Sequence, residues 1–263
     1  MLLDPEIPAE VVLRHRGQVS VVTLRRPEVR NALSRRMLGD LVDALVEADR
    51  CEQTGAIVLT GEGSAFCSGD DLGEAAATDA EAFDGAVALL QQVTAVLLEA
   101  DKPIVAAING AAVGGGLELT LACDLRVAAQ CAVFACPEVA WGLVGTNGSS
   151  LLLPAVVGHG RARDMLLTGW TYDATWALAA GLISEVLPDD QVLDRAMTLA
   201  EELVSRSQAV HLTRRLLSEA IREDVAHALE REAVAVGEAR RSSAAEASLR
   251  EFAARRVNGG TRR

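Results

Sequence analysis

Two glutamates, Glu118 and Glu138, stand twenty positions apart, each in a segment with few other charges. Glu118 follows the glycines at 114–116 and is flanked by leucines. Glycines let a substrate approach the backbone closely, and free N–H groups at a helix start stabilise negative charge. One carboxylate could deprotonate water and the other protonate carbon, while the N–H groups hold an enolate. This pattern suits addition of water to a polarised double bond, but by itself it indicates only an acid–base enzyme.

The two carboxylates are expected in different local settings. Side chains in a helix lean toward its N-terminus, so we expect the Glu118 carboxylate to point back to the N–H groups at the start of its own helix. Glu138 follows a proline at 137, so a loop is predicted there.

Motifs for other chemistries are missing. A dinucleotide-binding G-x-G-x-x-G would need glycine at Leu119, and the one lysine, Lys102, precedes Pro103 and so belongs to no phosphate-binding loop. No serine stands in G-x-S-x-G, and the four histidines are scattered. The five cysteines form no C-x-x-C pair, which is typical of free thiols in a reducing compartment. We therefore expect neither histidine-assisted nucleophilic catalysis nor a metal site.

The composition indicates an acidic globular protein. Its 263 residues carry 25 lysines and arginines against 37 aspartates and glutamates, a net charge of −12. Such a surface does not favour nonspecific binding of nucleic acid or anionic lipid. The first residues include acids and prolines, unlike a secretory signal. The uncharged run at 139–160 is rich in glycine, so it would make a poor membrane-spanning helix. We expect a cytoplasmic protein that binds neither nucleic acid nor membrane.

Alternating strands and helices are predicted to position the glutamates. A stripe of leucines after Ser34, which suits an N-cap, predicts one helix; a looser helical segment spans 89–97, and the glycines at 114–116 open a third helix. The predicted strands are 11–15, 19–24, 56–60, 104–108 and 125–129. The recurring strand–strand–helix order favours a layered α/β core.

From about residue 160 the sequence predicts helices throughout. Apolar stripes at 193–204 and 225–236 have helical spacing. Helices this apolar near a chain end pack on the body or on a neighbouring subunit. Because no linker intervenes, we expect one domain over 1–263, with a core at about 1–190 and a helical region at about 191–257.

Several segments, in order and spacing, resemble the crotonase (enoyl-CoA hydratase/isomerase) superfamily over most of the chain. They are Arg26–Leu33, Thr60–Leu72, Lys102–Gly110, Gly114–Leu119, Cys123-Asp124, Phe134–Glu138, Gly181-Leu182-Ile183 and Glu251–Arg256. Each segment is modest alone, whereas the ordered set is specific. The resemblance implies an α/β fold, a spiral of ββα repeats with a C-terminal helical trimerisation region, assembled as a homotrimer or hexamer.

The same resemblance implies an acyl-CoA thioester as substrate, with no metal and no redox cofactor. Glu118 and Glu138 match the two glutamates of family hydratases, which implies that Glu118 activates water and Glu138 protonates the α-carbon. It further implies that the backbone N–H groups of Asp70 and Gly115 hold the thioester oxygen.

The CoA part of the substrate would need cations. The resemblance places Arg26, Arg30, Ser68 and Arg255 where family members contact the nucleotide. The same arginines fit equally well as ordinary surface residues.

Two features depart from the family pattern. Asp70 stands where relatives often have a small or apolar residue, so its carboxylate is expected to point away from the thioester, because it would otherwise repel the enolate. Thr146, Asn147 and Ser149 occupy the stretch that borders the acyl end of the pocket. They indicate either an unusual acyl group or a helix cap.

The resemblance is greatest to an enoyl-CoA hydratase, which adds water to a trans-2-enoyl-CoA and yields a 3-hydroxyacyl-CoA. A Δ3,Δ2-enoyl-CoA isomerase, or other enolate chemistry, is an alternative because a single glutamate suffices to shuttle a proton. A non-catalytic acyl-CoA binder also stays open, with Asp70 as its best support. Some relatives bind RNA, which the net charge of −12 disfavours here.

Overall fold

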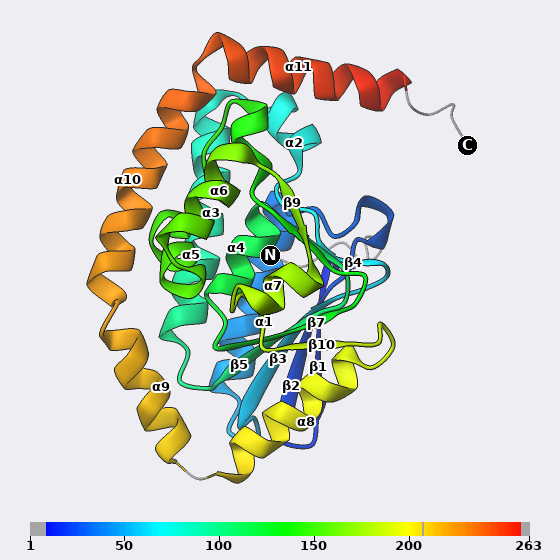
Figure 1. The fold of residues 1–263 in the computed structure, drawn as a ribbon, viewed down its shortest axis with the longest axis vertical. Helices are drawn as coiled ribbons and strands as arrows, with labels where there is room; N and C mark the ends of the chain where they lie inside the picture. Colours follow the sequence, from blue (N-terminus) through cyan, green and yellow to red (C-terminus); the bar gives the residue numbers. More distant parts are fainter. Residues whose placement is uncertain (1–8, 207, 259–263) are drawn as a thin grey trace.

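Two β-sheets form the centre of the computed structural model, which describes residues 9–206 and 208–258 (Figure 1). The larger sheet has the strand order β1 (Val11–Arg16), β2 (Val19–Leu24), β3 (Ala56–Gly61), β5 (Ile104–Ile108), β7 (Leu125–Ala129) and β10 (Glu185–Leu187). The smaller sheet has the order β4 (Ala65–Cys67), β6 (Ala111–Val113), β8 (Val133–Ala135) and β9 (Thr171–Asp173).

Most neighbouring strands run parallel, and the pairs β1–β2 and β8–β9 are antiparallel. The turn between β1 and β2 contains Gly17, whose φ of +59° lies in the region that glycine adopts without strain. Every residue of β3 and β5 is buried, as continuous apolar runs in parallel strands predict.

A strand–strand–helix unit repeats along the chain. The pairs β3–β4, β5–β6 and β7–β8 each place the first strand in the larger sheet and the second in the smaller one. The helices α3 (Ala80–Glu99), α4 (Gly115–Leu121) and α5 (Ser149–Val157) follow these pairs in turn. The predicted ββα spiral is therefore confirmed. The sequence predicts only the first strand of each pair, because three-residue strands are too short to show a period.

Helix α1 (Arg35–Arg50) begins as the sequence predicts. The Oγ of Ser34 accepts a hydrogen bond of 3.0 Å from the N–H of Met37, which caps the helix. Leu38, Leu41 and Leu45 are buried on the face that packs against the first two strands.

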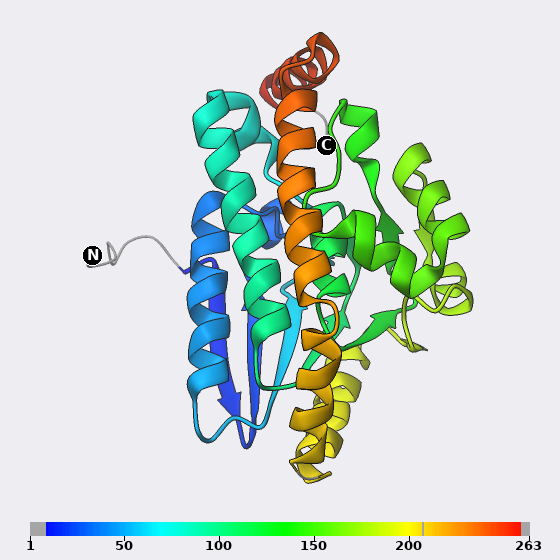
Figure 2. The same cartoon turned by 90° about the vertical axis from the view of Figure 1, so that its left-hand side faces the viewer.

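The remaining helical elements lie mostly after β8. They are η1 (Pro27–Val29), α2 (Leu72–Ala77), η2 (Pro137–Trp141), α6 (His159–Thr168), α7 (Ala174–Ala179), α8 (Val192–Ser205), α9 (Ala209–Glu219), α10 (Arg222–Arg240) and α11 (Ser243–Asn258). Figure 1 shows α9 and α10 along one side of the molecule, with α11 across one end, and in Figure 2 this side faces the viewer. Helix α8 packs on β3, β5 and β7, whereas α10 packs on α3 and α5, and α11 on α2 and η2. The C-terminal helices therefore cover the region around η2.

The expectation of helices throughout from about residue 160 is wrong at two places. Strand β9 pairs antiparallel with β8, and β10 pairs parallel with β7 from Glu185 to Leu187. Both strands have three residues at a sheet edge, so pairing with a preformed neighbour, rather than an alternating pattern, determines them.

Helix α3 contains a segment, Glu81–Glu99, that is long and apolar enough to cross a membrane by length and composition. A third of this segment is buried, and the helix packs against α1 and α10. Contacts within the fold therefore account for its apolar face.

Candidate active site

A pocket opens between α1, α2, α3, α10 and the loop after η2, with about 640 Å³ of space that includes its mouth. Most of its wall is apolar, and Asp70 and Glu138 are among its polar residues. The apolar residues are Leu33, Leu38, Leu72, Ala75, Ala82, Phe83, Ala86, Val87, Leu90, Leu143, Val144 and Val236. Such a wall suits a hydrocarbon group with polar atoms at one end.

Two backbone N–H groups meet beside the pocket. The N–H of Leu33 donates to the carbonyl of Gly69 at 2.9 Å, and the N–H of Asp71 donates to the carbonyl of Leu33 at 3.1 Å. This bridge leaves the N–H of Asp70 unused. A Cβ atom on Gly69 would lie 3.4 Å from the nitrogen of Gly115. Within the described residues, neither the N–H of Asp70 nor that of Gly115 donates to a protein acceptor. Both N–H groups are therefore available to an acceptor from outside the protein.

Glu118 lies on α4, and its side chain is only 2% exposed. Its Oε1 accepts a hydrogen bond of 3.1 Å from the N–H of Thr146, in the loop that leads to α5. The expected contact with the start of its own helix is replaced by this contact with another loop. Burial, and next the negative charges of Glu138 and Asp70, raise the pKa of Glu118 well above its ordinary value.

Glu138 lies in the 3₁₀ turn η2 and is half-buried. A Cβ atom on Gly114 would come within 2.8 Å of its Oε1, so the second glutamate lies directly against the glycine turn that opens α4. Gly114 has a φ of +54°, which also favours glycine. Burial raises the pKa of Glu138 to about 7, and the charge of Asp70 acts in the same direction. A carboxyl with this pKa can give or take a proton near neutral pH.

Asp70 does not point away from this site as the sequence analysis expects. Its side chain lines the pocket, and its Oδ1 lies 3.0 Å from the point that a Cβ atom on Gly115 would occupy. Asp70 is an exposed residue whose side chain faces the open pocket, while the protein around its carboxyl weakens the solvation of its charge. This desolvation raises the pKa of Asp70 to about 6.

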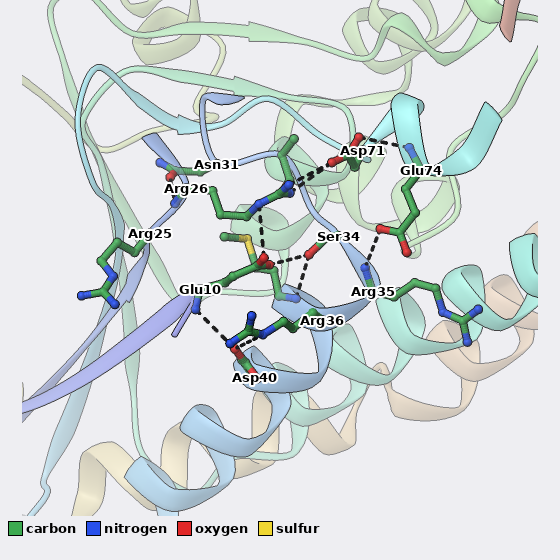
Figure 3. A network of polar contacts seen from close by, with 12 residues as sticks. Glu10, Arg25, Arg26, Asn31, Ser34, Arg35, Arg36, Asp40, Asp71 and Glu74 are labelled. Atoms are coloured by element: carbon green, nitrogen blue, oxygen red, sulfur yellow. Dashed lines mark hydrogen bonds and ion pairs between the residues drawn. The ribbon is translucent and has the colours of Figure 1, made fainter. Parts of the chain in front are cut away.

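Arg26 is held inside a polar network (Figure 3). Its guanidinium donates to Oδ2 of Asp71 at 3.1 and 3.2 Å and to the carbonyl of Ala32 at 2.6 Å, and it lies 3.5 Å from Glu10. Glu10 in turn accepts a hydrogen bond of 2.5 Å from the Oγ of Ser34. Arg26 therefore connects the start of α1 with the segment that carries Asp70.

The other residues expected at the CoA ligand differ in availability. Arg30 is exposed, with a φ of +54°. Ser68 donates from its Oγ to the carbonyl of Val29 at 3.2 Å, so it ties its loop to η1. The side chain of Arg255 lies outside the residues that the structure describes.

The loop at 145–150 joins Glu118 to α10. Thr146 lines the pocket, and Glu232 on α10 accepts hydrogen bonds from the N–H groups of Gly148 (2.7 Å) and Ser150 (2.9 Å). A side chain far along the chain thus caps α5, whose own N-cap residue makes no side-chain cap. A Cβ atom on Gly145 would lie 2.6 Å from Oε1 of Glu118.

Sequence reasoning missed Gly145 and Glu232. Glu232 had one signal in the sequence, because it is a charged residue inside the apolar stripe at 225–236. Gly145 had none, because its importance comes from the nearness of Glu118, 27 positions earlier.

The arrangement can move protons beside a stabilised anion. The two N–H groups lie near three carboxyl groups with raised pKa values, so an anion bound there would have proton donors and acceptors close by. Within the part of the chain that the structure describes, no group of three or more His, Cys, Asp or Glu residues has the arrangement to hold a metal ion.

Comparison with known proteins identifies relatives of this chain. The model of the family "Enoyl-CoA hydratase/isomerase" matches residues 14–258. A crotonyl-CoA hydratase of Syntrophomonas wolfei is 32% identical over 232 residues, which cover 86% of this chain and 88% of that protein. A probable enoyl-CoA hydratase of Mycobacterium bovis is 37% identical over 200 residues, covering 75% and 77%. The crystal structure of an enoyl-CoA hydratase/isomerase from Pseudoalteromonas atlantica superposes with a TM-score of 0.84 at 32% identity, covering 92% of this chain and 96% of that one.

Proposed function

We propose, because the chain belongs to the enoyl-CoA hydratase/isomerase family, that it adds water to a trans-2-enoyl-CoA and forms a 3-hydroxyacyl-CoA. The observation that carries the proposal is the meeting of Glu118 and Glu138 at the glycine turn 114–116, beside two unpaired N–H groups. A proton shuttle alone needs only one of these carboxyls, whereas hydration uses two.

The proposed reaction uses each group once. The N–H groups of Asp70 and Gly115 hold the thioester oxygen and polarise the conjugated double bond. Glu118 takes a proton from water as the oxygen of that water bonds to the β-carbon. The electron pair of the double bond moves into the enolate, and Glu138 delivers a proton to the α-carbon. No oxidation state changes overall, so we expect no redox cofactor, and we expect no metal because the two N–H groups already polarise the thioester.

The two glutamates act as one coupled site. Burial raises both pKa values, and the charge of Glu138 raises that of Glu118 further, so the two carboxyls titrate as a pair rather than independently. Hydration requires that one carboxylate binds the water while the other carboxyl carries the proton.

The apolar wall supports an enoyl group that extends toward α3 and α10, where Phe83, Val87 and Val236 line the pocket. For the CoA part, Arg30 is the stronger candidate, because it is exposed while Arg26 is held by Asp71. We place the protein in the cytoplasm, which suits its five free cysteines.

We further propose a homotrimer, alone or paired into a hexamer. Leu216 and Leu217 on α9 are 66% and 67% exposed, and such apolar side chains favour burial by a second copy. Light scattering of the purified protein measures the assembly, and a monomer at micromolar concentration would contradict this proposal.

The hydratase proposal is tested with crotonyl-CoA by following the absorbance of the conjugated enoyl thioester. We expect that absorbance to decay with the wild type, and we expect Glu118→Gln and Glu138→Gln to lower the rate by about 10²–10⁴. A wild type that fails to hydrate but converts a 3-enoyl-CoA would favour the isomerase. Binding of a CoA ester by calorimetry, without turnover of either substrate, would favour the non-catalytic binder.

A further inference from the structure

The side chain of Asp70 has no part in the reaction proposed above, which uses only its backbone N–H. It nevertheless lines the same pocket as Glu138, and its Oδ1 lies beside the backbone of Gly115. The thioester oxygen bound between the N–H groups of Asp70 and Gly115 would therefore lie close to this carboxyl. As a carboxylate it would repel the forming enolate, whereas as a neutral acid it would have a hydrogen to donate.

We propose that the Asp70 side chain is a third proton-carrying group of the active site, which in its neutral form donates a hydrogen bond toward the thioester oxygen. This inference rests on the proposed function. The hydrogen stays on Asp70 through the reaction, so the proton balance between Glu118 and Glu138 is unchanged. Asp70 thereby adds a third donor to the two backbone N–H groups.

The charges around Asp70 favour its neutral form. Desolvation raises the pKa of Asp70, and its charge raises the pKa of Glu118 on α4 and of Glu138 in η2, so no carboxyl among the three stabilises the charge of another. Its neighbour Asp71 is neutralised by Arg26. The buried thiol of Cys67, three residues before Asp70, carries no positive charge to offset the others.

The other elements around the pocket bring little positive charge. From α2, Glu74 adds another carboxylate to the wall. From α1, Arg35 is the cation among the described lining residues, and its guanidinium is directed to the carbonyl of Ala82 at 3.5 Å. The faces of α3 and α10 in the pocket are apolar. An enoyl group that displaces water from this pocket would favour the neutral acid further.

If Asp70 donates as a neutral acid, log kcat/KM should fall more steeply with rising pH than it would with Glu138 alone. Hydration would then need two groups in their protonated forms, Asp70 as donor and Glu138 as acid. Above the pKa values of both, log kcat/KM of the wild type is expected to fall with a slope of two. Asp70→Asn keeps the size and an N–H donor but does not titrate, so its slope should be one. Asp70→Ala should also have a slope of one, with kcat/KM at least ten-fold below that of Asp70→Asn at its maximum.

The experiment measures kcat/KM for crotonyl-CoA across the pH range for these proteins, with Asp84→Asn as matched control. Asp84 is an exposed carboxylate on α3 outside this pocket, so its removal should leave the wild-type profile. A wild-type slope of one, an unchanged slope of two in Asp70→Asn, or equal maxima for Asp70→Asn and Asp70→Ala would each overturn the proposal.

A binding measurement separates this proposal from the hydratase reaction itself. Acetoacetyl-CoA can bind as an enolate without being hydrated. Its affinity for the wild type, relative to Asp70→Asn, should fall as the pH rises through the ionisation of Asp70. If this ratio of the two affinities does not change with pH, the role of Asp70 is overturned, even if hydration is absent. If the ratio falls with rising pH but no hydration is seen, only the proposed function is contradicted.

Discussion

The N–H of Thr146 donates a hydrogen bond of 3.1 Å to Oε1 of Glu118, so the loop that follows the second glutamate holds the first one in place. The loop is fixed in turn by Glu232, through the N–H groups of Gly148 and Ser150. The side chain of Gln91 on α3 donates to the carbonyl of Thr146 at 2.9 Å. The position of Glu118 thus depends on α3, α10 and this loop, as well as on its own helix.

Gly145→Ala is expected to lower kcat for hydration by about 10- to 100-fold, because its methyl group would displace the Glu118 carboxylate and the Ser149 hydroxyl. The matched control is Gly39→Ala in α1, where a Cβ atom meets nothing within 4 Å. Steady-state kinetics together with circular dichroism checks the result. Equal kcat values for the two variants would show that the loop does not position Glu118.

Glu232→Gln should lower the free energy of unfolding by about 1–3 kcal/mol, because a buried acceptor of three hydrogen bonds loses its charge. The negative charge of Glu232 also raises the pKa of Glu118, so its removal should move the acidic limb of the activity profile to lower pH. Denaturant unfolding and a pH–rate profile measure both effects. Glu230→Gln, at an exposed position of the same helix, is the control and should change neither.

Glu138→Gln should make the protein more stable at alkaline pH. The pKa of Glu138 is about 7 in the folded protein and ordinarily 4.5, so the folded state binds the proton more tightly. Its contribution to stability is complete below pH 4.5 and is lost as the pH rises through 7, by up to about 3 kcal/mol. The variant, which cannot ionise, should exceed the wild type at pH 8 and match its pH dependence below 4.5. Denaturant unfolding at both pH values tests this, and a constant difference between the proteins would refute it.

Arg26→Ala should lower the stability of the protein, whereas Arg30→Ala should weaken its binding of the CoA thioester. Arg26 is bonded to Asp71 and Ala32, so its loss should lower the free energy of unfolding by about 1–3 kcal/mol. Arg30 is exposed, and its loss should raise KM for the CoA thioester about ten-fold, or about 1.4 kcal/mol, with kcat unchanged. Thermal unfolding and steady-state kinetics of both variants distinguish the two roles. An unchanged KM in Arg30→Ala would remove it from the CoA site.

Local patterns in the sequence determined the longer strands and several of the helices. The apolar runs at 56–60 and 104–108 become the fully buried strands β3 and β5, and Ser34 caps α1, because burial on both faces and an N-cap are encoded within a few residues. The ordered motifs around Glu118 and Glu138 were enough to indicate the family. The three-residue strands β4, β6, β8, β9 and β10 were not predictable, since pairing with a neighbouring strand forms them.

The sequence by itself determined which groups could do chemistry: two glutamates, a glycine turn and an aspartate at 70. Only the tertiary structure decided where the side chains point. It turned Glu118 to the N–H of Thr146, brought Asp70 against Gly115, and committed Arg26 to Asp71. The physical reason is that hydrogen bonds and desolvation depend on distance in space, and the partners here come from segments 28 and 45 residues apart.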